Sequence, residues 1–224
     1  MGRWLDLGLF ITASVLLVLG SIWGLFIAPP EAMMGDVYRI MFVHVPAAWA
    51  ALMAYTTCLV ASVIYLFTGK SGADHVAAAS AEVGLVFNAL LLITGSLWGR
   101  PTWGVWWTWD PRLTTAAIMF FAYAGYLALR GAIDDDRRRS TWCAVVGIII
   151  YADIPLVWFS VKMWNSLHQL QSSPKTMDPA MVTPLRIGAF AFLFAFLWLV
   201  RRRVVALDLR AQNDVLMMNE GDPR

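Results

Sequence analysis

The chain has 224 residues, of which 59% are hydrophobic and 14% charged, with a formal net charge of +2. This composition is typical of an integral membrane protein. The sequence contains no phosphate-binding glycine loop, no hydrolase nucleophile elbow and no basic stripe, so nothing indicates a nucleotide-binding, hydrolytic or nucleic-acid-binding function. Both cysteines, Cys58 and Cys143, lie inside apolar runs without metal-ligand spacing, and we expect them to be small core residues.

Six apolar stretches approach or reach the length that an α-helix needs to cross a bilayer. They cover residues of about 7–28, 45–67, 76–98, 113–129, 141–161 and 184–200. Asp110 and Pro111 are expected to be the N-cap and first residue of the fourth helix. Asp153 and Pro155 interrupt the fifth stretch, and the polar tail from Val204 is expected to be a short helix or disordered. We therefore predict an all-α integral membrane protein, with residues 1–224 forming a single polytopic domain of six transmembrane helices.

Positively charged residues indicate the orientation of the spans, because cytoplasmic loops carry an excess of Lys and Arg. With the amino terminus inside and six crossings, the two strongest arginine clusters, 137–139 and 201–203, fall on the same side. Both termini are therefore expected in the cytoplasm. The Trp-rich segment 98–114 and the segments 29–45 and 162–183 are expected on the outer side.

The segment between the third and fourth stretches begins Trp98-Gly-Arg-Pro-Thr-Trp-Gly-Val-Trp-Trp-Thr-Trp-Asp-Pro-Arg112. Its glycines and prolines argue against one regular helix. Its aromatic faces and two arginines, Arg100 and Arg112, suit a large, flat, partly apolar and anionic ligand, since guanidinium groups pair with carboxylates. The alternative is a membrane-interface belt, because tryptophan is enriched where lipid meets water. We favour the ligand because so many tryptophans lie close together: Trp98, Trp103, Trp106, Trp107 and Trp109.

Two of the three histidines, His44 and His168, are predicted at the outer ends of spans, whereas His75 lies in a cytoplasmic turn. A lone histidine at such a place is usually a polar residue at the lipid boundary. Two on the same side, one before and one after the Trp-rich segment, favour iron ligation, because haem accepts one imidazole on each face. Zinc fits less well, since no Cys, Asp or Glu completes a tetrahedral set. If the fifth helix continues outward, Trp164 and His168 share one helical face.

Three stretches together resemble the WWD family of membrane haem-handling proteins, and within it the haem exporter C branch of bacterial cytochrome c maturation. The Trp-rich segment, continued to Thr114, resembles the family signature. The stretches His44-Val-Pro-Ala-Ala-Trp49 and Trp164-Asn-Ser-Leu-His-Gln169 resemble its flanking histidine motifs. Length and span number also match, so the resemblance covers nearly the whole chain. The sequence departs from the pattern at Met163, where a tryptophan is expected, and at Asp153, where a neutral polar residue is expected.

The resemblance implies a haem-binding protein of the bacterial inner membrane that is not an enzyme. It implies that haem b is held at the periplasmic face and delivered to a periplasmic haem chaperone during c-type cytochrome biogenesis. His44 and His168 would be the axial iron ligands, the Trp-rich segment the haem platform, and Arg100 and Arg112 the propionate contacts. The implied partners are the permease and ATPase subunits of an ABC transporter, a small single-span membrane protein and the chaperone, and none is a nucleic acid.

Two other functions remain open from the residues alone. A redox subunit resembling a transmembrane b-type cytochrome carries histidines deep within spans, often in pairs on facing helices, and this sequence has none there. A permease subunit for another solute needs polar residues along an intramembrane path, for which only Glu82, Asn88 and Asp153 qualify. Asp153 is either a functional ionisable group or a hydrogen-bonded helix–helix contact, and we favour the contact because Pro155 breaks the backbone ladder nearby.

Overall fold

The computed structural model describes residues 2–168 and 177–220, with side chains described to residue 217. Within these ranges the elements are α1 (Gly2–Ile22), the π-helix η1 (Trp23–Ile27), the 3-10 helix η2 (Asp36–Ile40), α2 (Met41–Thr68), α3 (Ser71–Trp103), α4 (Pro111–Ala132), α5 (Asp136–Ile150), α6 (Asp153–Met163) and α7 (Pro179–Glu220). Six segments are long and apolar enough to cross a membrane, and α5 with α6 forms the fifth. The prediction of a helical membrane protein with six spans is confirmed.

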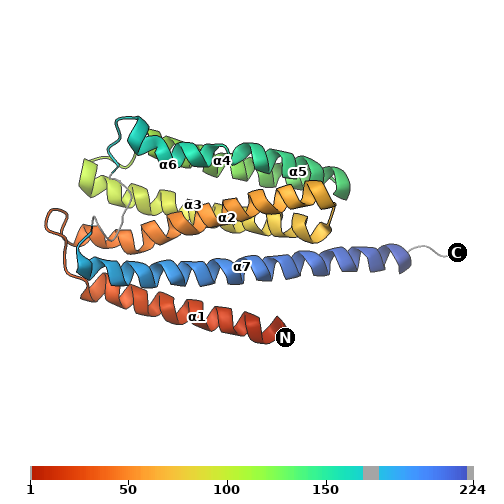
Figure 1. Ribbon diagram of the computed structural model, residues 1–224, viewed down its shortest axis with the longest axis horizontal. Helices are drawn as coiled ribbons and strands as arrows, with labels where there is room; N and C mark the ends of the chain where they lie inside the picture. The colour runs from red at the N-terminus through yellow and green to blue at the C-terminus, as the bar shows by residue number, and fades with distance from the viewer. Residues whose placement is uncertain (1, 169–176, 221–224) are drawn as a thin grey trace.

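The long helices lie side by side along the longest axis of the molecule, as Figure 1 shows. α2 packs along α3, and α7 packs against both. α1 lies at the edge of the bundle against α7, while α4, α5 and α6 cover the opposite side of the α2–α3 pair. Both termini lie at one end of the bundle, and the connection between α3 and α4 lies at the other end.

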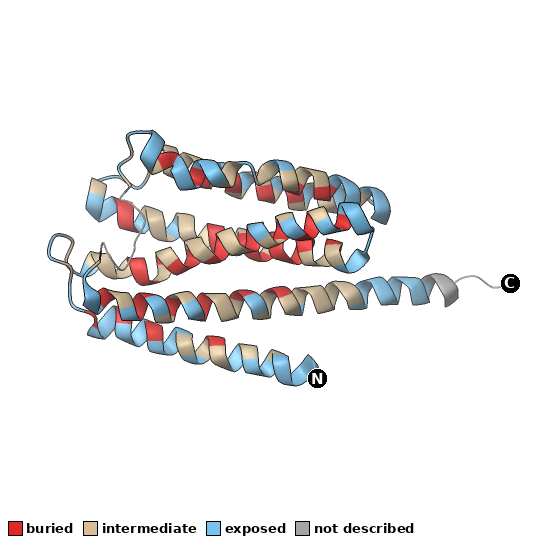
Figure 2. Ribbon diagram, in the orientation of Figure 1, coloured by how far each residue is buried: buried red, intermediate tan, exposed pale blue. Residues whose placement is uncertain are grey.

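Small residues allow α2 and α3 to pack closely. Both helices bury several alanines, and a Cβ added to Gly84 of α3 would lie 2.6 Å from the ring of Tyr55 on α2. Close approach through small residues is the usual way to gain packing energy between helices in lipid, where hydrophobic force between them is weak. Figure 2 shows buried residues concentrated on this pair, whereas α1 exposes many apolar side chains. The α2–α3 pair is thus the central support of the bundle.

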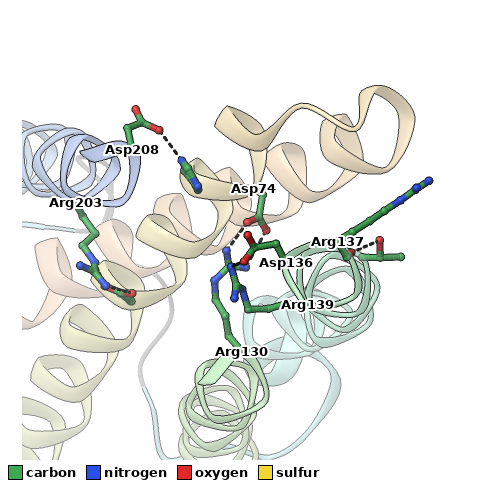
Figure 3. Close-up of polar contacts among 10 residues, drawn as sticks. Asp74, Arg130, Asp136, Arg137, Arg139, Arg203 and Asp208 are labelled. Atoms are coloured by element: carbon green, nitrogen blue, oxygen red, sulfur yellow. Dashed lines mark hydrogen bonds and ion pairs between the residues drawn. The ribbon is translucent and has the colours of Figure 1, made fainter. Parts of the chain in front are cut away.

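Ion pairs join the helices near the end that carries the termini (Figure 3). Arg130 of α4 forms a bidentate pair with Asp74 of α3, with an Nη1–Oδ1 distance of 2.8 Å. Arg203 of α7 pairs with Glu82 of α3, with an Nη2–Oε1 distance of 2.8 Å. The arginine cluster 137–139 lies in the first turns of α5 at the same end. Charge is therefore gathered at the end that the arginine distribution predicts to be cytoplasmic.

The tail after the sixth span differs from the prediction. α7 continues as one helix to Glu220, whereas a short helix or disorder was expected after Val204. Two contacts with α3 hold the part beyond the span, the Arg203–Glu82 pair and a pair between Asp208 and His75. Residues 204–217 also include three leucines and two alanines, which propagate helices well.

The Trp-rich segment is not one regular helix, as predicted, but its first part is helical because α3 extends past the expected end of the third span at Trp98. α3 continues through Pro101 to Trp103, and the hydroxyl of Thr102 donates to the Trp98 carbonyl at 2.7 Å. Gly104 then ends the helix with a φ of 81°, a left-handed conformation that glycine adopts without strain. The end of α3 at Trp103 leaves Trp98 and Trp103 on the helix. The other three tryptophans of the segment lie in the connection to α4.

The fifth crossing breaks into α5 and α6 as the residues Asp153 and Pro155 predict. α6 ends at Met163, and Trp164 is extended, with φ −131° and ψ 157°. Backbone N–H groups beyond this point bond to side chains rather than to preceding carbonyls. The helix does not continue outward, so the condition under which Trp164 and His168 would share one helical face is not met.

Candidate functional site

A cavity of about 250 Å³ lies at the end of the bundle opposite the termini, between α2, α3, α4, α6 and the segment after α6. Most of its lining is apolar, with a few polar and charged side chains. This combination is typical of small-molecule and cofactor sites. The predicted site residues that line the cavity are His44, His168, Trp98, Trp103, Trp107 and Arg112.

His44 lies in the first turns of α2 and is only 8% exposed. The edge of its ring meets Trp98 of α3, with ring centres 5.6 Å apart and planes at 85°. Its Nδ1 lies 3.0 Å from Oγ1 of Thr94, also on α3. The imidazole is therefore held by the central helix pair, and no flexible loop is needed to place it.

His168 lies on the segment that follows α6, and side chains fix the backbone around it. The hydroxyl of Ser166 accepts a hydrogen bond from the His168 N–H at 3.0 Å. The preceding N–H, of Leu167, donates to Oδ2 of Asp110 at 2.7 Å. The other carboxylate oxygen of Asp110 accepts from the Arg112 N–H at 2.9 Å, which confirms Asp110 as the N-cap of α4. One carboxylate thus ties the histidine segment to the Trp-rich segment.

The rings of His44 and His168 lie 6.4 Å apart, centre to centre, with planes inclined by 30°. Two imidazoles on opposite faces of one iron have centres on the order of 6 Å apart, because each nitrogen lies roughly 2 Å from the metal. No group of three or more His, Cys, Asp or Glu among the described residues could hold a metal ion. Two imidazoles alone suit an iron whose remaining positions a macrocycle fills, and they do not suit zinc. The side chains present therefore fit haem.

The tryptophans divide into two groups. Trp98 is buried, Trp103 has its ring centre 6.5 Å from that of His168, and Trp107 lines the cavity with them. Trp106 and Trp109 do not line it and are 56% and 83% exposed. Trp109 meets Trp107 edge to face, with ring centres 6.1 Å apart. The structure thus brings three of the five predicted tryptophans to the histidines and leaves the other two exposed on the surface of the protein.

The two predicted arginines also differ in position. Arg112 lines the cavity, and its Nη1 is buried without a hydrogen-bond partner among the described residues. A buried guanidinium N–H without an acceptor is costly, so this group is placed to receive an anion. Arg100 points elsewhere: it donates to the Gly104 carbonyl and lies over the ring of Trp106, 6.0 Å from its centre. The structure therefore brings Arg112, but not Arg100, to the cavity.

Two residues of α3 that contact His44 were not predicted from the sequence. They are Thr94, the hydrogen-bond partner, and Gly95, where an added Cβ would lie 3.1 Å from Cε1 of the His44 ring. Thr94 precedes Trp98 by four residues, so helical spacing could have placed both on one face of α3. Gln169 of the second histidine motif lies outside the described residues.

Comparison with known proteins identifies the family. The family model described as Heme exporter protein C matches residues 2–218. A Heme exporter protein C of Escherichia coli is 40% identical over 207 residues, covering 91% of this chain and 84% of the relative. The one from Haemophilus influenzae is 39% identical, covering 86% of this chain and 81% of the relative. A Marchantia polymorpha protein named "putative cytochrome c biosynthesis ccmC-like mitochondrial protein" is 34% identical, covering 91% and 86%. The chain belongs to the haem exporter protein C family.

Proposed function

We propose that this membrane protein binds haem b between His44 and His168 at the outer end of the bundle and delivers it to a periplasmic haem chaperone during c-type cytochrome biogenesis. The observation that carries this proposal is the 6.4 Å separation of the two imidazole rings beside an aromatic cavity. The printed names of the relatives supply the context of haem export and cytochrome c biosynthesis. The protein is a haem-handling component and not an enzyme.

Each predicted site residue that lines the cavity has a role in this proposal. His44 and His168 would hold the iron of bound haem through their imidazole nitrogens. Trp98, Trp103 and Trp107 pack against the apolar ring. The guanidinium of Arg112 binds a propionate carboxylate and so satisfies its buried N–H.

Arg100, Trp106 and Trp109 form the rim of the proposed haem platform. Their exposure supports contacts with the edge of the macrocycle or with an acceptor that approaches from the same side. Such an acceptor would meet aromatic surface beside the haem, and aromatic residues are enriched in interface cores.

The orientation and the partners belong to the proposal too. The arginine clusters lie at the end with the termini, which favours a periplasmic cavity in the bacterial inner membrane and cytoplasmic termini. The described chain offers no phosphate-binding loop, so any ATP-driven step is assigned to the permease and ATPase subunits of an ABC transporter. A small single-span membrane protein completes the proposed assembly.

The position of the histidines separates delivery from transmembrane electron transfer. His44 and His168 lie at the same end of the bundle, and His75 lies near the other end, paired with Asp208. A b-type cytochrome that carries electrons across the membrane needs haem ligands at more than one depth. The single outer site therefore favours a protein that holds haem for transfer.

Transfer is tested with purified protein loaded with haem and a haem-free soluble haem acceptor. We expect the haem absorption to move from the purified membrane protein to the acceptor. Exchange should be slower when a bulky thiol reagent is attached to the exposed position 109 in Trp109→Cys and so blocks the outer face. Haem that stays with the protein and instead cycles between oxidation states with membrane electron donors would support the b-type cytochrome alternative.

A further inference from the structure

The hydrogen bond between His44 and Thr94 has a direction that other contacts of Thr94 determine. Oγ1 of Thr94 lies 3.0 Å from Nδ1 of His44. The same oxygen lies 2.7 Å from the carbonyl oxygen of Leu90 and 3.2 Å from that of Leu91. Both carbonyls can only accept, so the single hydroxyl proton of Thr94 is donated to this backbone pair. Toward His44 the hydroxyl offers a lone pair.

It follows that Nδ1 of His44 carries a proton and donates it to Thr94. A neutral imidazole has one protonated nitrogen, so Nε2 of His44 is then the unprotonated nitrogen with a lone pair for a metal. His44 is 8% exposed, which leaves water little room to compete for Nδ1. The contact thus selects one of the two tautomers before any ligand binds.

Gly95, the next residue of α3, allows this contact. A Cβ at this position would lie 3.1 Å from Cε1 and 3.7 Å from Nδ1 of His44. The absence of a side chain lets the imidazole edge lie close against α3, with Nδ1 beside the Thr94 hydroxyl. The two adjacent residues therefore act together, one by hydrogen bonding and one by leaving space.

We propose that Thr94 is a positioning residue for His44, which sets its tautomer and ring orientation so that Nε2 faces the cavity ready to bind iron. The part of this proposal that concerns iron binding rests on the proposed function, whereas the part that concerns the tautomer of His44 does not. A metal-bound histidine usually donates its second N–H to an acceptor, which fixes the ring and raises the basicity of the ligating nitrogen. Loss of such a partner typically costs about 10–100-fold in metal affinity.

The first experiment reads the tautomer in the haem-free protein. The chain has only three histidines, so ¹⁵N-histidine labelling gives a small set of signals that His44→Ala and His75→Gln assign. We expect His44 near neutral pH to carry its proton on Nδ1. In Thr94→Val, which keeps the branched shape but lacks the hydroxyl, the Nε2–H form should gain population. Thr94→Ser, which keeps the hydroxyl, should retain the wild-type tautomer.

The second experiment measures the haem release rate and the haem midpoint potential of the haem-loaded protein. Thr94→Val should release haem about tenfold faster or more. Its haem midpoint potential should move to more positive values, because a less basic imidazole stabilises the ferric ion less. Thr94→Ser, which keeps the hydroxyl, should show the wild-type release rate and midpoint potential. The matched control is Thr57→Val on α2, because the Thr57 hydroxyl bonds only the Met53 carbonyl, at 2.8 Å, among the described contacts. This control should leave potential and release rate unchanged.

The outcomes separate this proposal from the proposed function. If wild-type His44 carries its proton on Nε2, or if Thr94→Val keeps the wild-type tautomer, potential and release rate, Thr94 does not position His44. The haem site could still stand in that case, because His44→Ala would lose the ligand. If His44→Ala instead keeps an unaltered haem spectrum, the proposed haem site itself fails, while the tautomer measurement remains a valid test of the Thr94 contact.

Discussion

Asp110 accepts a hydrogen bond from the backbone N–H of Leu167, with an Oδ2–N distance of 2.7 Å. Its other oxygen caps α4 through the Arg112 N–H, and the side chain is only 7% exposed. The aspartate that closes the Trp-rich segment therefore fixes two things at once, the start of α4 and the segment that carries His168. It contributes to the site through the backbone, without lining the cavity.

Replacing Asp110 by Ala should loosen the His168 side of the site. The change removes two part-buried hydrogen bonds to a charged acceptor, each worth about 1.5–3 kcal/mol, and leaves both N–H groups without that partner. We expect a lower melting temperature and faster haem loss from the purified protein. Asp178→Ala is the matched control, because Asp178 accepts from Ala180 N at 2.8 Å near the start of α7 and does not line the cavity. Equal haem loss in the two variants would contradict the assigned role of Asp110.

Replacement of Arg112 and of Arg100 should weaken haem retention to different extents. Arg112→Ala removes the buried guanidinium in the cavity and should weaken haem retention by roughly 1.5–3 kcal/mol, about 10- to 100-fold. Arg100→Ala should weaken it much less, because Arg100 bonds the Gly104 carbonyl and covers Trp106 outside the cavity. Haem titration of both variants measures the difference. Equal losses, or a larger loss for Arg100→Ala, would place the propionates outside the cavity.

Two glycines of α3 should give distinct defects when changed to alanine. In Gly95→Ala the new Cβ would lie 3.1 Å from the His44 ring, so the haem absorption spectrum should change while the protein remains folded. In Gly84→Ala the Cβ would lie 2.6 Å from the Tyr55 ring, so the α2–α3 pair must move apart and the melting temperature should fall. Gly125→Ala on α4 is the control, because nothing lies within 4 Å of its Cβ position. A wild-type spectrum in Gly95→Ala would show that the His44 ring tolerates crowding from α3.

The orientation of the bundle is open to a direct test. Reporter fusions after Gly131 and at the carboxyl end of α7 should report the cytoplasm, because both points lie at the end with the arginine clusters. A fusion within residues 104–110 should report the periplasm. A cytoplasmic signal from that fusion would invert the bundle and remove the cavity from the proposed site of delivery.

The sequence was sufficient to predict the spans and the meeting of the two histidines. Span length and apolarity identify the helices. Four predicted spans lie between His44 and His168, and because this number is even, both histidines must lie at the same end of the bundle. Which of the tryptophans face the cavity could not be predicted. It depends on α3 continuing past Pro101 and ending at Gly104, which packing and backbone conformation decide together.

Other features depend on contacts between distant parts of the chain. The Thr94–His44 bond joins residues 50 positions apart, and the Leu167–Asp110 bond joins residues 57 apart. No local pattern in the sequence encodes either contact. The length of α7 depends partly on such a contact, because Asp208 forms a hydrogen bond with His75 of α3 beyond the predicted span.

The central claim is that His44 and His168 together bind the iron of haem. The most direct test is the absorption spectrum of the haem-loaded, detergent-purified protein, compared with His44→Ala, His168→Ala and the distant control His75→Ala. We predict a six-coordinate low-spin spectrum in the wild type and in His75→Ala, and a five-coordinate iron or loss of haem in each of the other two. An unaltered six-coordinate low-spin spectrum in both His44→Ala and His168→Ala would show that these residues are not the ligands.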